Sequence, residues 1–257
     1  MRFASLGSGS RGNATLVEAA GTCLLVDCGY SMREFEARCQ GLGVDPGAID
    51  ALLVTHEHGD HVRGVGPLAR KYGLPVWMTH GTWRRARCGE IPNLHLFGAH
   101  AGAFTLGGVR VQPYAVPHDA REPCQFLFSA GGRRLGLLTD VGAITPRIRQ
   151  CLQGLDALIL ECNHDPQMLR TGPYPPALQA RVGGNYGHLS NGQAAQLLQS
   201  IDQARLQRLV LAHLSEKNNH PELAEAAVRP VWRGPDDGLA ILGQGSWSGW
   251  FEVAGPA

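Results

Sequence analysis

The chain has 257 residues, of which 44% are hydrophobic and 18% charged, and it carries a formal net charge of +1. This balance excludes a disordered protein, and one α/β domain over residues 1–257 can bury a sizeable core. The small net charge excludes recruitment of nucleic acid by a global field, so any such contact needs local patches. Candidate patches are Arg84, Arg85 and Arg87, and Arg133 with Arg134, for which solvated surface arginine is an equally good interpretation.

Cysteine usage points to a reducing compartment. There are 7 cysteines, none of them in a Cys-x-x-Cys pair, and several lie in apolar runs. This pattern favours reduced, buried thiols. The N-terminal residues lack a secretory apolar core, and no run approaches the ~18 apolar residues that a membrane helix needs. We therefore expect a cytoplasmic protein with no membrane partner.

Short apolar runs predict strands, and amphipathic segments between some of them predict helices. The clearest helix begins at Ser190, where Ser-x-x-Gln forms a capping box and Ala194, Leu197, Leu198 and Ile201 share one face. Early strands are mostly joined by hairpins and later strands alternate with helices, which predicts two sheets packed between helices. The predicted strands are 15–18, 23–27, 51–55, 75–79, 109–116, 135–139, 157–161, 208–212 and 239–243; the predicted helices are 32–40, 190–204 and 221–232.

The most informative segment is Thr-His-Glu-His-Gly-Asp-His at residues 55–61, directly after the apolar run 51–54. Its imidazoles and carboxylate are the donors that borderline and hard divalent metals prefer. His56 and His58 project to the same side of the strand-like part, whereas Asp60 and His61 follow on a turn. One ion does not need four ligands packed this closely, so the segment predicts two. The alternative is a surface loop that is merely rich in histidine.

Three more candidate ligands close predicted strands. His118 follows the strand at 109–116, Asp140 follows 135–139, and His213 follows 208–212. The carboxyl ends of strands are where open α/β sheets gather their site residues. Taken singly, each is equally well explained as a polar residue that closes a strand. Together with residues 56–61 they complete two ligand sets.

These residues resemble the ordered ligand motifs of the metallo-β-lactamase fold, which implies an αββα four-layer sandwich. The second half of the chain also resembles ribonuclease Z, in its His188, its Gln-Ala-Ala helix and its strand-His-x-Ser ending. The chain departs from the usual pattern at Cys124-Gln125 and at Val141. Further segments resemble the WalJ/YycJ (VicX) family of this fold: 5–13, 116–123, 160–165, 174–175, 187–191 and 214–219.

The resemblance implies a role for each ligand. The first ion is held by His56, His58 and His118, the second by Asp60, His61 and His213, and Asp140 bridges the two. Both zinc and manganese suit these donors. Two such ions about 3.5–4 Å apart can present a bridging hydroxide as nucleophile and neutralise a phosphodiester. Asp60 can in addition orient that water or accept its proton.

Other residues are expected around the metals. His188 matches the non-ligand histidine of ribonuclease Z, which implies a contact with the scissile phosphate or protonation of the leaving oxygen. The alternative is a structural histidine bonded to a loop carbonyl. The Gly-rich loop with Ser8, Ser10 and Asn13 can cradle a phosphate or be a plain turn. His164 and Ser190 are the predicted substrate-binding residues, His164 alternatively supporting the ligands; Asp119 and Glu161 are predicted to orient ligand imidazoles.

By family resemblance, the expected reaction is metal-dependent hydrolysis of phosphodiesters in DNA, as an exonuclease. A chain of this length has no room for an added cap domain, so small substrates stay open. The first alternative is a cyclic phosphodiesterase, lactonase or thioesterase on the same metals. A basic groove would favour nucleic acid and an enclosed apolar pocket a small molecule. A second alternative is a non-catalytic regulator of two-component signalling, against which the complete ligand set argues.

Overall fold

The computed structural model describes residues 1–255, in which the chain forms two compact units. Unit 1 comprises Met1–Ala115, Ala120–Arg133 and, within the described residues, 243–255. Unit 2 comprises Val116–Asp119 and Arg134–Leu242. The single domain expected from the length of the chain remains a prediction. No helix within residues 1–255 is both long enough and apolar enough to cross a membrane.

Unit 1 is built on a seven-stranded mixed sheet with the order β14-β1-β2-β3-β4-β5-β6. The strands β3 to β6 run parallel, so their carboxyl ends meet at one edge of the sheet. The bounds are β1 (Arg2–Gly7), β2 (Ala14–Ala19), β3 (Thr22–Val26), β4 (Ala51–Leu53), β5 (Val76–Thr79), β6 (Leu94–Phe97) and β14 (Phe251–Glu252). The same unit contains the antiparallel strands β7 (Phe104–Leu106), β8 (Val109–Ala115) and β9 (Cys124–Ala130).

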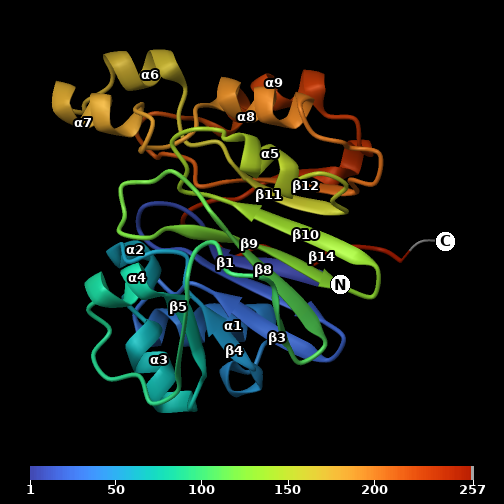
Figure 1. Ribbon diagram of the computed structural model, residues 1–257. Helices are drawn as coiled ribbons and strands as arrows, with labels where there is room; N and C mark the ends of the chain where they lie inside the picture. Colours follow the sequence, from blue (N-terminus) through green and yellow to red (C-terminus); the bar gives the residue numbers. More distant parts are fainter. Residues whose placement is uncertain (256–257) are drawn as a thin grey trace. The chain divides into compact units, whose positions relative to one another are not determined.

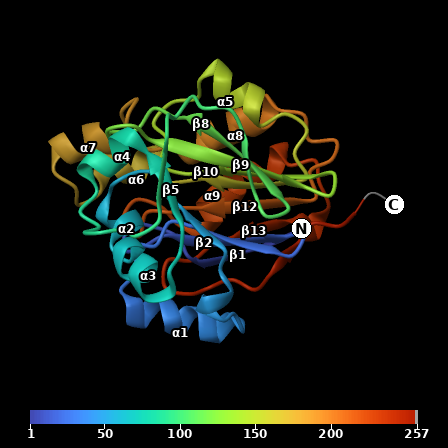
Figure 2. The same ribbon diagram turned by 60° about the horizontal axis from the view of Figure 1, so that its bottom comes forward.

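Two helices of unit 1, α1 (Met32–Leu42) and α3 (Val65–Tyr72), lie along the same side of this sheet (Figure 2). Phe35 of α1 and Leu68 of α3 are fully buried in one cluster with Leu25 and Leu52 of the strands. The Ser31 capping box starts α1, and Gly43, with φ of 73°, ends it. The remaining helices are the 3₁₀ turn Pro46–Ala48, α2 (Gly59–Val62) and α4 (His80–Arg85).

Unit 2 is built on four parallel strands in the order β10-β11-β12-β13. Parallel strands are covered on both faces, and β11 accordingly reads Ala-Leu-Ile-Leu-Glu with every residue buried. The helices α8 and α9 lie side by side (Figure 1). The bounds are β10 (Arg133–Leu138), α5 (Pro146–Cys151), β11 (Ala157–Glu161), α6 (Pro166–Thr171), α7 (Pro176–Val182), α8 (Asn191–Gln199), β12 (Arg208–Ala212), α9 (Pro221–Val228), two 3₁₀ turns at Arg229–Val231 and Asp236–Gly238, and β13 (Leu239–Ile241).

Two predicted helices are longer than the observed ones. The helix predicted over 190–204 is α8, which Ser190 caps as expected but which ends at Gln199. The side-chain amide of Gln203 donates to the backbone carbonyl of Leu198 at 2.8 Å, where the chain has already left the helix axis. The helix predicted over 221–232 ends at Val228, because Pro230 lacks the N–H that would continue it.

Candidate metal centre

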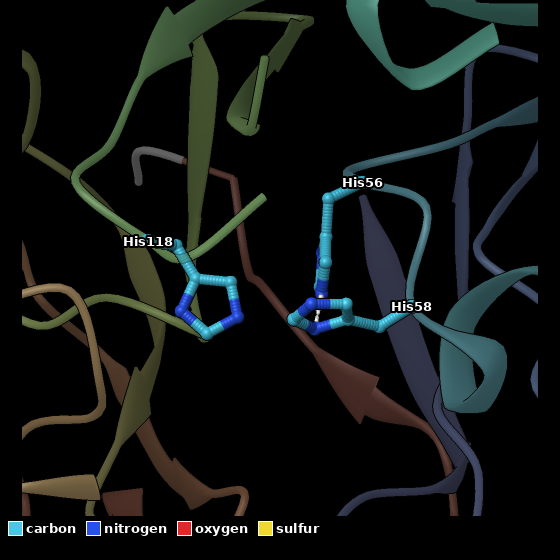
Figure 3. A group of neighbouring side chains, drawn as sticks. All are labelled: His56, His58 and His118. Carbon is cyan, nitrogen blue, oxygen red and sulfur yellow. Dashed lines mark hydrogen bonds between the residues drawn. The ribbon is translucent and has the colours of Figure 1, made fainter. Parts of the chain in front are cut away.

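Unit 1 gathers three imidazoles just after β4, with His56 and His58 on the loop and His61 in α2. His56 and His61 are fully buried, and the Nε2 atom of His56 lies 3.0 Å from Nδ1 of His58. Figure 3 shows these two rings turned toward each other. The ring of His61 packs against that of His56 with centroids 4.1 Å apart. Ring nitrogens this close need a shared proton or a shared cation, so the arrangement suits a metal.

The buried carboxylate of Asp27 holds this loop in place. It accepts hydrogen bonds from the amide and hydroxyl of Thr55 at 2.8 and 2.7 Å, and it lies 2.8 Å from Nδ1 of His61. With Nδ1–H donating to Asp27, His61 has its lone pair on Nε2, the ring atom that can serve as a ligand. Sequence reasoning missed this role and treated Asp27 as the end of a strand. The available signal was an acidic residue closing an apolar run, the same signal that identified Asp140.

Asn13 joins the Gly-rich loop to the same cluster. Its side-chain nitrogen lies 3.0 Å from Nε2 of His61 and 3.3 Å from Oδ2 of Asp60, and its Oδ1 accepts the amide of Gly9 at 2.8 Å. The amide of Gly12 closes a turn onto the carbonyl of Gly9 at 3.1 Å. These bonds are those of a turn braced against Asp60 and His61.

Unit 2 gathers a second cluster at the carboxyl ends of its parallel strands. Asp140, Glu161, His188 and His213 each offer a ligand atom, and these atoms lie within 4.8 Å of one another. Asp140 follows β10, Glu161 ends β11, and His213 follows β12, whereas His188 comes from the loop before α8. The parallel register of the strands therefore creates the cluster.

Glu161 is the centre of this cluster. Its fully buried carboxylate lies 2.8 Å from Nδ1 of His188 and 2.9 Å from Nδ1 of His213. It also accepts the backbone amides of Asp140, Val141 and Leu189 at 3.0–3.2 Å. Because Nδ1 of each ring is engaged by the carboxylate, the Nε2 atoms of both are oriented away from it.

The charges in this cluster shift the pKa values of Glu161 and His188. Burial raises the pKa of Glu161, but the charge and hydrogen bond of His188 and those of His213 outweigh it and lower this pKa. Burial lowers the pKa of His188, but Glu161, helped by Asp140 and Asp119, raises it to about 9. His188 is therefore charged at neutral pH when no cation competes with its proton.

His118, drawn in Figure 3, belongs to the segment Val116–Asp119 of unit 2. Its Nδ1 lies 3.1 Å from the carbonyl oxygen of Gly187, and its Nε2 lies 3.4 Å from Oδ1 of Asp119 and 4.0 Å from Oδ1 of Asp140. His213 approaches the same Asp140 oxygen at 3.5 Å. Unit 2 thus brings together every ligand predicted from its residues, and His188 lies beside them.

Backbone strain marks three of these positions. Asp27, Asp140 and His213 adopt left-handed backbone with φ of 59°, 51° and 56°. Each comes just after a parallel strand, where an ordinary extended residue would continue away from the edge. Such conformations cost about 1–2 kcal/mol for residues other than glycine and cluster at functional sites. The left-handed backbone at these positions changes the direction of the chain at the ends of the strands.

The predicted substrate-binding residues lie next to one another. His164 and Ser190 form an isolated β-bridge, and the amide of Asn191 donates to the carbonyl of His164 at 2.9 Å. Both residues line a cavity of about 470 Å³ in unit 2. His164 is buried, and burial lowers the pKa of its imidazole. Asp119 contacts His118 as described and also forms an ion pair with Arg181.

The prediction of a basic patch at Arg133 and Arg134 is wrong. Arg133 is buried, and Arg134 donates to the carbonyls of Gln153 and Gly154 and through its amide to Asp156, so this pair contributes no surface patch. The patch of Arg84, Arg85 and Arg87 lies at and just after the end of α4, with each residue exposed.

Residues 22–214 match the Beta-lactamase superfamily domain. The chain belongs to this family. It is 38% identical over 234 residues to Exodeoxyribonuclease YycJ of Bacillus anthracis, covering 90% of this chain and 89% of that protein. The predicted WalJ/YycJ resemblance is therefore confirmed, and the chain is a metal-dependent hydrolase.

Solved structures agree on the fold. The metallo-β-lactamase fold protein YhfI of Bacillus subtilis matches with a TM-score of 0.73 and 17% identity, over 96% of this chain and 98% of its own. Human tRNase Z, short form, matches with a TM-score of 0.65 and 19% identity, over 99% and 100%. The α/β sandwich of two mixed sheets flanked by helices is confirmed, as is the likeness to ribonuclease Z.

The residues in place fit a divalent cation. Each unit presents imidazole nitrogens together with carboxylate oxygens, the mixed donor set of borderline and hard metals. In unit 1 Nδ1 of His61 is bonded to Asp27, and in unit 2 Nδ1 of His213 is bonded to Glu161. Such bonds fix the tautomer that leaves Nε2 for a metal, as ligand histidines require.

Proposed function

We propose that this chain is a phosphodiesterase that degrades DNA as an exonuclease, using two divalent ions, Zn²⁺ or Mn²⁺. One observation carries the proposal. The chain is 38% identical, along 90% of its length, to a protein named Exodeoxyribonuclease YycJ, and each of its units also places imidazoles beside carboxylates. The free state of its cysteines supports a cytoplasmic location, where thiols stay reduced.

The proposed ligands follow the sequence motifs. His56, His58 and His118 serve one ion, Asp60, His61 and His213 serve the other, and Asp140 serves both. The bonds of Asp27 to His61 and of Glu161 to His213 support these assignments, because each leaves Nε2 as the donor atom. When bound, the ions supply charge neutralisation of the phosphodiester and acidify a water molecule.

His188 and Asp60 are the proposed catalytic residues. Nδ1 of His188 is bonded to Glu161, so its Nε2 carries the second proton and can donate it to a phosphate or leaving oxygen. The side chain of Asp60 is 24% exposed and lies 3.5 Å from Nε2 of His61. It is therefore accessible to a water molecule whose proton it can accept.

Two surface features support a nucleic-acid substrate. The exposed Arg84, Arg85 and Arg87 in unit 1 offer positive charge to phosphates. In unit 2, Tyr186 is 65% exposed and lies two residues before His188. Exposed aromatic rings are the platforms on which proteins stack single-stranded bases, with little sequence preference.

The test is degradation of end-labelled single- and double-stranded DNA with Mn²⁺, with Zn²⁺ or with chelator, and His58→Ala as the control. Stepwise loss of nucleotides that needs metal and disappears in the variant is expected. No cleavage by protein that holds two metals would contradict the DNA proposal and favour cyclic phosphodiesters, lactones or thioesters. A regulatory phenotype that survives His58→Ala would instead favour a binding role.

A further inference from the structure

Unit 2 contains a cavity of about 470 Å³ outside the imidazole cluster. Its walls come from α6, α7 and the start of α8, together with His164 after β11. This volume lies within the range of small-molecule sites. The residues that line the cavity differ in chemistry from the imidazole–carboxylate cluster, so we consider its ligand separately.

The lining suits a flat, neutral ligand with hydrogen-bonding edges. Leu169 and Ala180 give apolar walls, and no acidic residue is among the described residues that line the cavity. Gln193 uses its Oε1 for the Ser190 cap, which leaves its amide protons, and Gln179 donates to the carbonyl of Tyr174, which leaves its Oε1. The walls therefore contain one amide donor and one amide acceptor.

The charges of the lining argue against a bare phosphate as the main ligand. Arg170 is its one cationic side chain among the described residues, and it is exposed at the surface. Burial lowers the pKa of His164, so this imidazole is neutral at neutral pH. A ligand with one anionic group and a larger neutral body fits better than a multiply charged anion.

The cavity is joined to the loop that carries His188. Ser190 lines the cavity, follows His188 by two residues, and is bridged to His164. Glu161 holds two adjacent residues of this loop, through Nδ1 of His188 and the backbone amide of Leu189. A group held in the cavity is thus placed relative to His188 by three consecutive residues.

We propose that this cavity binds the base of the terminal deoxynucleotide, next to the bond that is hydrolysed. The inference rests on the proposed function. The base lies between the apolar walls with its polar edge toward Gln179 and Gln193, and Arg170 accompanies its phosphate. Each of the four bases has both a hydrogen-bond donor or amino group and an acceptor on its polar edge, so one amide donor from Gln193 and one amide acceptor from Gln179 suit all of them, as an exonuclease requires.

The decisive variant is Ala180→Trp, which fills the cavity from its exposed edge on α7. Ala177→Trp on the same helix is the matched control, because Ala177 is exposed but does not line the cavity. Each variant is tested on DNA that ends in a normal nucleotide and on DNA that ends in an abasic one. The wild type and Ala177→Trp are expected to prefer the normal end by about tenfold in kcat/KM, about 1.4 kcal/mol. Ala180→Trp is expected to lose that preference while keeping its rate on the abasic end.

Equal rates of the wild type on both ends, or a preference that survives Ala180→Trp, would overturn the inference. A calorimetric measurement of deoxynucleoside monophosphate binding to the metal-loaded protein tests the base-binding cavity separately from the proposed function. Tighter binding of these nucleotides than of deoxyribose 5-phosphate, lost in Ala180→Trp, supports the cavity even if DNA is not cleaved. Equal affinity for the two ligands overturns it even if DNA is cleaved.

Discussion

Nδ1 of His188 donates to the fully buried carboxylate of Glu161 at 2.8 Å. That carboxylate also engages His213 and the backbone amides that follow β10 and precede α8. One side chain at the end of β11 therefore sets the positions of a proposed catalytic residue and a proposed ligand. A buried charge with this many partners is costly to disturb, because each partner is left unsatisfied.

Replacing Glu161 by Gln is expected to lower metal affinity and DNA cleavage by about 10–100-fold, as for other residues that orient ligands. The amide keeps the shape of the side chain but cannot accept from every present donor. The measurement is metal affinity by competition with a chelating dye, alongside cleavage rate. Glu222→Gln, on the exposed face of α9, is the control and should match the wild type. Unchanged metal affinity in Glu161→Gln would contradict the orienting role.

The raised pKa of His188 predicts a pH dependence of stability in chelated protein. Its pKa is raised from 6.5 to about 9, so the charged ring favours the folded state fully below pH 6.5. That contribution is lost as pH rises toward about 9. The free energy of unfolding in urea should fall over this window by about 1–3 kcal/mol.

His188→Gln should abolish this difference, because glutamine does not titrate. The comparison is between urea unfolding curves of the two proteins at pH 6 and pH 9, in chelator. An equal fall in both proteins would assign the pH dependence to other groups.

Asp27→Asn tests the residue that sequence reasoning missed. Asparagine accepts through one oxygen only, so the bonds to Thr55 and to Nδ1 of His61 cannot all remain. Metal affinity is expected to fall by about 10–100-fold. Asp50→Asn is a suitable control, since the carboxylate of Asp50 accepts the amide of Cys23 at an exposed turn. Equal metal affinity of the two variants would contradict the role of Asp27.

Much of the candidate site could be predicted, because its residues directly follow apolar strands. His118, Asp140 and His213 could be found in this way. The segment 55–61 could be found from its density of histidines alone. Asp27 also directly follows an apolar strand, but its contacts could not be predicted, because its partners Thr55 and His61 lie after β4 and in α2, 28 and 34 residues later. Only the pairing of β3 with β4 brings them together.

The fold shows the same division. The first residue of α8 could be predicted, because its capping box is formed by residues close together in the sequence. The short strand β7 and the helices α2 and α6 were not predicted, since tertiary contacts rather than periodicity stabilise such short elements. Arg133 was predicted as a surface residue, although the structure buries it.

The exposed arginines of unit 1 predict salt-dependent DNA binding. Changing Arg84 and Arg85 together to Ala should weaken binding of single-stranded DNA and reduce the slope of log K against log salt by up to about 0.7 per lost phosphate contact. Fluorescence anisotropy of labelled DNA over a salt series measures both. Arg147→Ala, an exposed arginine on α5 of unit 2, is the control. A slope unchanged from the wild type would remove these arginines from the DNA-binding surface.

The most direct test of the two-ion account is a titration of chelated protein with Mn²⁺ or Zn²⁺, following DNA cleavage and bound metal together. The account predicts that cleavage reaches its maximum only at two equivalents of bound metal. His58→Ala should bind less metal and stay inactive at that ratio. Full cleavage at one equivalent, or cleavage that persists without bound metal, would contradict the account.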